Sequence, residues 1–139
     1  MDKSAPGKFP TLISFSQALP KLKTTGIYTR AKFAQDHPEM VRDYLRAVLT
    51  VYRSIRENPK SLYDALRKHV KMDAATAKLV GDAYIEREIW DVNGGLTTED
   101  VKYSLDFFTQ MGSVPTGLDA AKITDLTYLD AVVQQLGQK

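Results

Sequence analysis

The chain has 139 residues, of which 43% are hydrophobic and 26% charged, a composition typical of a globular protein of one domain. Its 19 basic and 17 acidic residues leave a formal net charge of +2, which gives no support to nucleic-acid binding. The absence of cysteine excludes disulfides, thiol catalysis and thiolate metal sites, and no apolar run is long enough to cross a bilayer.

The first ten residues contain Pro6, Gly7 and Pro10 among small and charged residues. This pattern predicts a flexible lead over residues 1–10 and a single, largely helical domain over residues 11–139. The lead lacks the apolar core of a signal peptide, so we expect the export signal of any secreted parent protein to lie upstream.

Two short apolar runs rich in β-forming residues follow, TLISF at residues 11–15 and GIYT at residues 26–29. They predict one or two short N-terminal strands. Two strands alone do not make an independently stable sheet. We therefore expect these strands to need further strands, or a helix to lie on, from elsewhere.

Residues 30–59 carry the strongest helix pattern in the chain. Asp36 or His37 can cap the helix start and Pro38 suits its first turn, whereas Asn58-Pro59 ends it. Apolar residues recur between these signals at steps of three and four residues: Val41, Tyr44, Leu45, Val48, Leu49, Tyr52 and Ile55. This spacing predicts an amphipathic helix, and we expect Tyr44 and Tyr52 to lie in the core.

Four further helices are predicted from start and stop signals. Asn58-Pro59 can begin a second helix that runs to about Met72, and Asp73 can cap a third that continues towards Trp90. Gly81 marks close packing or a break in the third helix. Thr97, after a turn at residues 93–95, can cap a fourth helix that ends at Gly112. Thr127 can cap a fifth helix. The expected fold is mainly α, with about five helices.

No catalytic or metal-binding constellation is visible. His37 and His69 lack partners at metal-ligand spacing, and we expect structural or solvated roles for both. The acidic residues Glu86, Glu88 and Asp91 are interpreted as a charged helix face. We therefore expect a protein that is not an enzyme and uses no cofactor. Trp90, before a glycine-rich turn, is a candidate anchor for a partner.

Several ordered motifs resemble one family, the ABC-transporter solute-binding proteins of the nitrate, sulfonate, taurine and thiamine-precursor group. The likeness covers roughly residues 12–137, and its motifs are helix starts and stops. They follow a strand expected at residues 26–29 and are Phe33-Ala34, His37-Pro38-Glu39, Arg56-Glu57-Asn58-Pro59, Leu96-Thr97-Thr98-Glu99 with Phe107-Phe108 and Met111-Gly112, and Asp125-Leu126-Thr127-Tyr128-Leu129.

The resemblance implies the C-terminal part of a type II periplasmic-binding-protein (α/β) fold, whose two lobes hold a small solute. The parent protein would be periplasmic, or extracellular and membrane-associated, and would deliver its solute to the membrane permease of an importer. By analogy residues 18–25 would cross the hinge, so Thr24 and Thr25 are the candidate ligand-binding residues.

The resemblance also implies that this chain lacks most of the sheet of the first lobe and most of the second lobe. Uncovered helix faces and strand edges tend to be buried by association, so we expect a homodimer. Two alternatives remain open. One is a free-standing helical interaction module without a small ligand, and the other, disfavoured by the lack of a catalytic cysteine or histidine cluster, is a related pyrimidine-precursor synthase.

Overall fold

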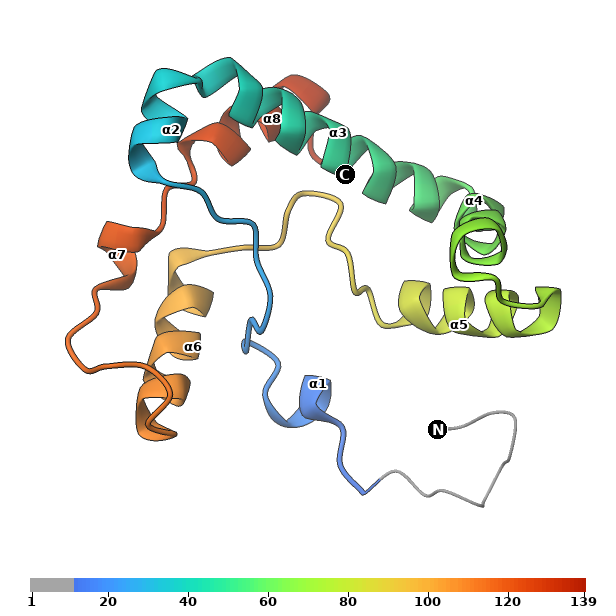
Figure 1. Cartoon of the computed structure of the whole chain (residues 1–139), viewed down its shortest axis with the longest axis horizontal. Helices are drawn as coiled ribbons and strands as arrows, with labels where there is room; N and C mark the ends of the chain where they lie inside the picture. The colour runs from blue at the N-terminus through green and yellow to red at the C-terminus, as the bar shows by residue number, and fades with distance from the viewer. Residues whose placement is uncertain (1–11) are drawn as a thin grey trace. The chain divides into compact units, whose positions relative to one another are not determined.

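A computed structural model describes residues 12–139, and these residues form helices joined by loops (Figure 1). Eight α-helices and one π-helical turn follow one another in this part of the chain. Their bounds are α1 Phe15–Ala18, α2 Ala31–Asp36, α3 Pro38–Glu57, α4 Pro59–Ala65, η1 Leu66–Val70, α5 Ala74–Glu86, α6 Thr98–Gln110, α7 Ala120–Ile123 and α8 Thr127–Leu136. No helix of the described residues is long and apolar enough to cross a membrane.

The described residues divide into two compact units. The first unit contains residues 12–28 and Leu96–Leu126, and the second contains Thr29–Gly95 and Thr127–Lys139. The expected lead over residues 1–10 lies outside the described residues, and the single domain over residues 11–139 stays a prediction.

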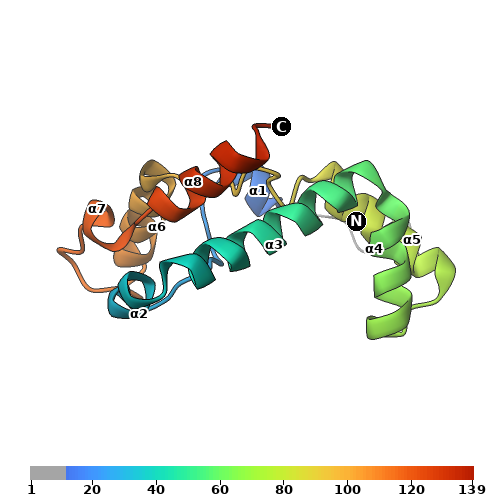
Figure 2. The ribbon, with the colours of Figure 1, turned by 90° about the horizontal axis from the view of Figure 1, so that it is seen from above.

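The core of the second unit lies between α3 and α8, which run side by side (Figure 2). Leu49 of α3 is 1% exposed and meets Val132 and Val133 of α8, at 0% and 7%. The partly buried Leu45, Tyr52, Leu129 and Leu136 surround them. The amphipathic spacing of α3 therefore buries one face, and a helix from about 80 residues further along the chain covers it.

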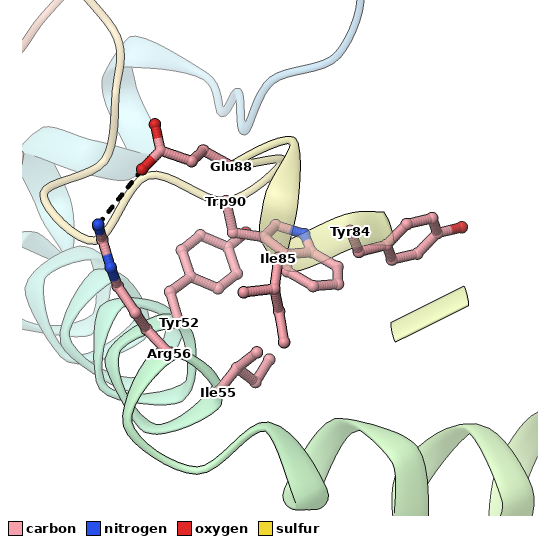
Figure 3. Close-up of a pocket in the computed structure, with 7 residues that line it drawn as sticks. All are labelled: Tyr52, Ile55, Arg56, Tyr84, Ile85, Glu88 and Trp90. Carbon is pink, nitrogen blue, oxygen red and sulfur yellow. Dashed lines mark hydrogen bonds and ion pairs between the residues drawn. The ribbon is translucent and has the colours of Figure 1, made fainter. Parts of the chain in front are cut away.

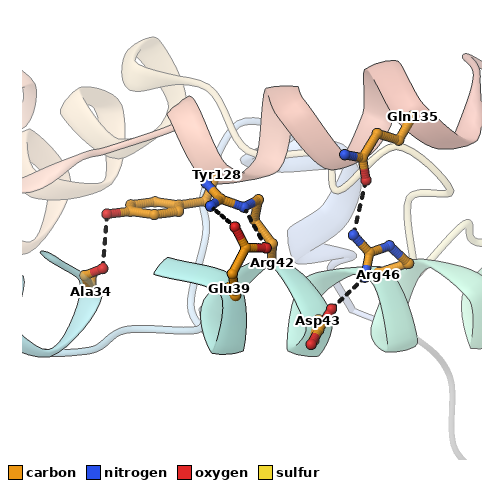
Figure 4. A network of polar contacts seen from close by, with 7 residues as sticks. All are labelled: Ala34, Glu39, Arg42, Asp43, Arg46, Tyr128 and Gln135. Carbon is orange, nitrogen blue, oxygen red and sulfur yellow. Dashed lines mark hydrogen bonds and ion pairs between the residues drawn. The ribbon is translucent and has the colours of Figure 1, made fainter. Parts of the chain in front are cut away.

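A polar network joins the same two helices beside this core (Figure 4). The Tyr128 hydroxyl donates to the Ala34 carbonyl at 3.0 Å, and the Arg42 guanidinium lies 6.0 Å from the Tyr128 ring centroid. Arg42 also pairs with Glu39, whose pKa is lowered by that hydrogen bond and by the charge of the arginine. One turn along α3, Arg46 donates to Gln135 of α8 at 2.9 Å.

The buried side chain of Arg53 ties α3 to two other segments of the second unit. Its guanidinium donates to the carbonyls of Val92 at 3.0 Å, Leu136 at 3.0 Å and Gly137 at 2.6 Å, and to the Asn93 side-chain oxygen at 3.0 Å. All four acceptors are neutral oxygens. Arg53 therefore satisfies the backbone where the chain leaves α8 and where it turns at residues 91–95.

A second helix pair, α4 and α5, packs around Gly81. A Cβ at Gly81 would lie 2.5 Å from Cδ1 of Tyr63, so the ring rests directly on the α5 backbone. The Tyr63 hydroxyl donates to Asp82 at 2.5 Å, which raises the pKa of Tyr63. Of the two predicted roles of Gly81, the structure shows close packing.

The first unit is built on α6, which contacts α7. Thr97 caps α6 by accepting from the Asp100 amide at 3.1 Å, as predicted. Gly112, at φ +71°, ends the helix with bonds from the amides of residues 112 and 113 to Thr109 and Phe108. The buried Ser104 hydroxyl of α6 accepts from the Lys23 amide at 2.8 Å and thereby holds the N-terminal segment of this unit.

The prediction of N-terminal strands is wrong for the residues that the structure describes. Within TLISF, Thr11 lies outside those residues, residues 12–14 have no regular structure, and Phe15 begins α1. Residues 26–29 have no regular secondary structure and no strand partner in the described part of the chain. β-forming composition gives a strand only where a neighbouring strand supplies hydrogen bonds.

The prediction of a mainly α fold is confirmed, but the count of five helices is too low. The five predicted helices correspond to α3, α4, α5, α6 and α8, whereas α1, α2 and α7 have only four, six and four residues. Such segments are too short to display a helical period. The caps also differ in part, because Asp73 accepts from two amides but neither His37 nor Asn58 makes a side-chain cap bond.

Candidate functional site

The candidate site is a small pocket in the second unit between α3, α5 and the loop after α5 (Figure 3). Its volume is about 120 Å³. Three segments contribute its lining, which consists of Tyr52, Ile55 and Arg56 of α3, Tyr84 and Ile85 of α5, and Glu88 and Trp90 of the loop.

Trp90 is the centre of the aromatic wall of the pocket. Its ring lies stacked on Tyr52, with centroids 6.0 Å apart, and meets Tyr84 edge-on at 5.4 Å. Both arrangements are favourable for aromatic quadrupoles. Tyr52 is partly buried and also packs on the α3–α8 core, as predicted.

Tyr44, predicted to lie in the core, is 54% exposed and lies outside the pocket. The reason is that α8 covers only one side of the broad apolar face of α3. The periodicity of the sequence shows which residues are apolar, but it does not show how much of the face a partner covers.

One ion pair borders the pocket. Nη2 of Arg56 lies 3.3 Å from Oε1 of Glu88, and both side chains are more than half exposed. Glu88 occupies this place because the chain reverses there at φ +47°. The amides of Glu88 and Ile89 donate to the carbonyls of Ile85 and Tyr84, which is the usual C-terminal helix closure, with glutamate where glycine is preferred.

The size of the pocket limits what it can bind. Pockets for drug-sized ligands measure about 300–1,000 Å³. A volume of about 120 Å³ instead suits one apolar side chain or a comparably small group. Tryptophan, tyrosine and arginine are the residue types most enriched where a partner protein is anchored.

The two threonines predicted to contact ligand lie elsewhere. Thr24 and Thr25 are exposed and lie near the end of residues 12–28 of the first unit, where no regular secondary structure is assigned. Their role in binding stays a prediction.

The remaining candidate residues of the sequence are dispersed. The His37 ring contacts Phe33, with centroids 4.9 Å apart, and His69 is exposed in η1. The acidic residues separate, since Glu88 pairs with Arg56 and Asp91 accepts from the Asn93 amide at 2.7 Å. The described residues contain no group of three or more acidic or histidine side chains that could hold a metal ion.

Sequence reasoning identified Trp90 as a possible anchor but missed the pocket around it. Tyr52 and Tyr84 lie 32 residues apart in the sequence, and no local pattern indicates that their rings meet at Trp90. The one available signal is the position of Ile85, Trp90 and Tyr84 around a helix end, where apolar residues often pack back on the helix.

No protein-family model, curated protein or solved structure matches this chain. The resemblance to solute-binding proteins therefore rests on the motifs of the sequence.

Proposed function

We propose that this chain is the C-terminal part of the solute-binding component of an ABC importer. In this proposal the parent protein is not an enzyme and captures a small organic or anionic solute, such as nitrate, a sulfonate, taurine or a pyrimidine precursor. It acts outside the cytoplasmic membrane and passes the solute to a membrane permease. Thr24 and Thr25 are the proposed contacts to the solute.

The observation that carries this proposal is the position of the motifs. His37-Pro38 lies at the start of α3, and Asn58 separates the end of α3 from the start of α4. Thr97 caps α6, and Thr127 begins α8. Motifs that coincide with helix boundaries describe the order and lengths of helices, so the resemblance concerns a folding pattern rather than isolated dipeptides.

Uncovered apolar surface also supports a larger parent fold. On α3, Met40, Tyr44 and Val51 are 58%, 54% and 53% exposed, on a side that α8 leaves open. Helices of α/β proteins bury such a face against a sheet. The unpaired β-forming residues 26–29 are a further part that a sheet would accommodate.

A second candidate function is a free-standing helical interaction module. The pocket around Trp90 favours it, because the pocket has the size and residue types of an anchor site for a partner side chain. In this case the uncovered side of α3 is part of a protein interface.

The coding region around this chain separates the two candidates. The transport proposal predicts an in-frame upstream region that encodes a secretion signal and the rest of two α/β lobes, beside genes for a permease and an ATPase. An isolated reading frame with unrelated neighbours would contradict that proposal and favour the interaction module.

The parent protein, once expressed, tests the two threonines. We expect Thr24→Val or Thr25→Val to weaken solute binding about tenfold through loss of a hydrogen bond. Thr29→Val, in the same exposed segment, is the matched control and should leave binding unchanged. Equal affinities for all three variants in calorimetric titration would remove Thr24 and Thr25 from the site.

A further inference from the structure

Residues 24–29, TTGIYT, have the composition of a strand but lie unpaired on the surface. Five of the six residues are β-branched or aromatic, the types that favour strands. All six are exposed, and the side chains of Tyr28 and Ile27 are 95% and 56% exposed. Burial of these two apolar side chains against another surface would be favourable.

The backbone of this segment is held at its ends and open between them. The Lys23 amide donates to Ser104 at 2.8 Å, and the Arg30 carbonyl accepts from the Ala34 amide at 3.1 Å. Arg30 itself has extended backbone angles, φ −71° and ψ 137°. Within the described part of the chain, no hydrogen bond reaches the backbone of residues 24–29. Backbone whose amides and carbonyls are unpaired is a template for strand addition.

We infer that residues 25–29 pair in antiparallel orientation with the same segment of a second copy of this chain, about a two-fold axis at Ile27. This inference goes beyond the proposed function and concerns the 139-residue chain by itself, without the sheet that the parent protein would supply. It assigns a surface to the homodimer that the sequence predicts.

The register follows from which residues meet. Antiparallel partners must lie on the same face of the ribbon, so the sequence numbers of two opposing residues have an even sum. With the axis at Ile27, Ile27 meets Ile27, each Tyr28 covers Gly26 of the other copy, and each Thr25 meets Thr29. Aliphatic, aromatic–glycine and threonine pairs are all favourable cross-strand contacts.

The register with its axis at Gly26 is less favourable. With the axis at Gly26, two glycines meet at the centre and contribute no side-chain contact, and Ile27 meets Thr25. The pairing segment carries no charge in either register. With the axis at Ile27, the flanking Lys23 and Arg30 fall opposite Ala31 and Thr24, so no like charges face each other directly.

Cysteine cross-linking of the full 139-residue chain tests the register, because the natural sequence contains no cysteine. Ile27→Cys places two thiols directly opposite each other, at a Cα separation of about 4.5–5.5 Å that a disulfide can span. Gly26→Cys is the matched control. A Cβ at Gly26 meets nothing within 4 Å, and Gly26 has no positive φ, so the substitution is tolerated.

In the proposed register, the Cα atoms of residue 26 in the two copies lie about 8 Å apart across the ribbon. This separation is too large for a disulfide between the two thiols of the Gly26→Cys variant. We therefore expect Ile27→Cys to form disulfide-linked dimer about tenfold faster than Gly26→Cys at equal concentration, since pairing raises the effective thiol concentration. Equal, slow rates for both variants would overturn the inference, and faster linkage of Gly26→Cys would overturn the register.

A non-covalent measurement complements the cross-linking. A two-stranded ribbon is marginally stable, so the association of the cysteine-free chain should depend on concentration in sedimentation velocity. Ile27→Lys places two ammonium groups on the axis and should shift the chain to monomer. The matched variant Ile13→Lys, at a comparably exposed isoleucine, should sediment as the unmodified chain does. Monomer at all concentrations, or dimer unaffected by Ile27→Lys, would contradict the inference.

Discussion

At the scale of single residues, Arg53 shows how a buried cation can be held by neutral groups. Its guanidinium binds three carbonyls and one amide oxygen that belong to residues 92–93 and 136–137. No local pattern predicts this role, because the arginine stands among several others on α3 and its partners are about 40 and 80 residues away.

Removal of this side chain should destabilise the second unit strongly. We expect Arg53→Met to lower the free energy of unfolding by about 3 kcal/mol, because buried carbonyls lose their donors. The matched control is Arg56→Met on the same helix, whose exposed ion pair should contribute less than about 1 kcal/mol. Urea denaturation measures both, and equal losses would contradict the assigned role of Arg53.

Glu88 and Gly112 occupy equivalent positions at the C-terminal ends of α5 and α6, so the two helix ends can be compared. Both lie at positive φ just past a helix with the same two closing hydrogen bonds. Replacement of the strained Glu88 by glycine should stabilise the chain by about 0.5–1 kcal/mol, and Gly112→Ala should destabilise it by about 1 kcal/mol.

The control for the first change is Glu88→Ala, which removes the same carboxylate but keeps a Cβ at positive φ. It should not be stabilising. If Glu88→Gly and Glu88→Ala have the same urea midpoint, backbone strain at residue 88 is absent.

At the scale of helices, the packing of α4 on α5 depends on Gly81. Alanine is the better helix former by about 1 kcal/mol, which alone would make Gly81→Ala stabilising. The added Cβ would overlap a ring, however, and overpacking costs about 1–3 kcal/mol. We therefore expect a net loss of stability by urea denaturation.

A double-mutant cycle separates these two effects. In a Tyr63→Ala background the space above residue 81 is open, so Gly81→Ala should become stabilising. The same sign in both backgrounds would show that helix propensity, and not the ring, decides the outcome.

The start of α5 predicts a pH dependence. The Asp73 carboxylate accepts from the Thr76 hydroxyl at 2.6 Å and from the Thr76 and Ala75 amides, and these bonds lower the pKa of Asp73. A lowered pKa contributes stability above the unfolded-state value, and this contribution disappears as the pH falls through the folded-state value.

Below about pH 4, the natural chain should therefore lose part of the stability that it has in excess of the Asp73→Asn variant. Asparagine can still cap the helix but does not titrate there. Urea midpoints of both chains between neutral and acidic pH measure the difference. A gap that stays constant down to acidic pH would contradict the role of the Asp73 charge.

How much of this fold the sequence predicts depends on the range of the interactions. The five longer helices are readable because caps such as Asp73 and Thr97 and the period of α3 are local. The face of α3 that meets α8, the junction at Arg53 and the pocket at Trp90 depend on residues far apart in the sequence. The β-forming residues 26–29 do not form a strand, because a strand also needs a partner strand, and local composition does not show whether one is present.

At the scale of the whole molecule, the proposed function makes a negative prediction for the isolated chain. Two threonines on one exposed segment do not enclose a solute, and small ligands are bound where most of their surface is covered. Calorimetric titration of this chain with taurine, nitrate or a sulfonate should give no heat of tight binding. Micromolar affinity for any of them would contradict the proposal that the site needs the rest of two lobes.

The pairing of α3 with α8 has a consequence for synthesis. Leu49 reaches its partners Val132 and Val133 only after roughly 80 further residues have been made, and translation proceeds at about 5–20 residues per second. The apolar side of α3 is thus open on the ribosome for several seconds, a period long enough for chaperones to bind it. The nascent chain should therefore be most prone to aggregation in the interval between the completion of α3 and the emergence of α8.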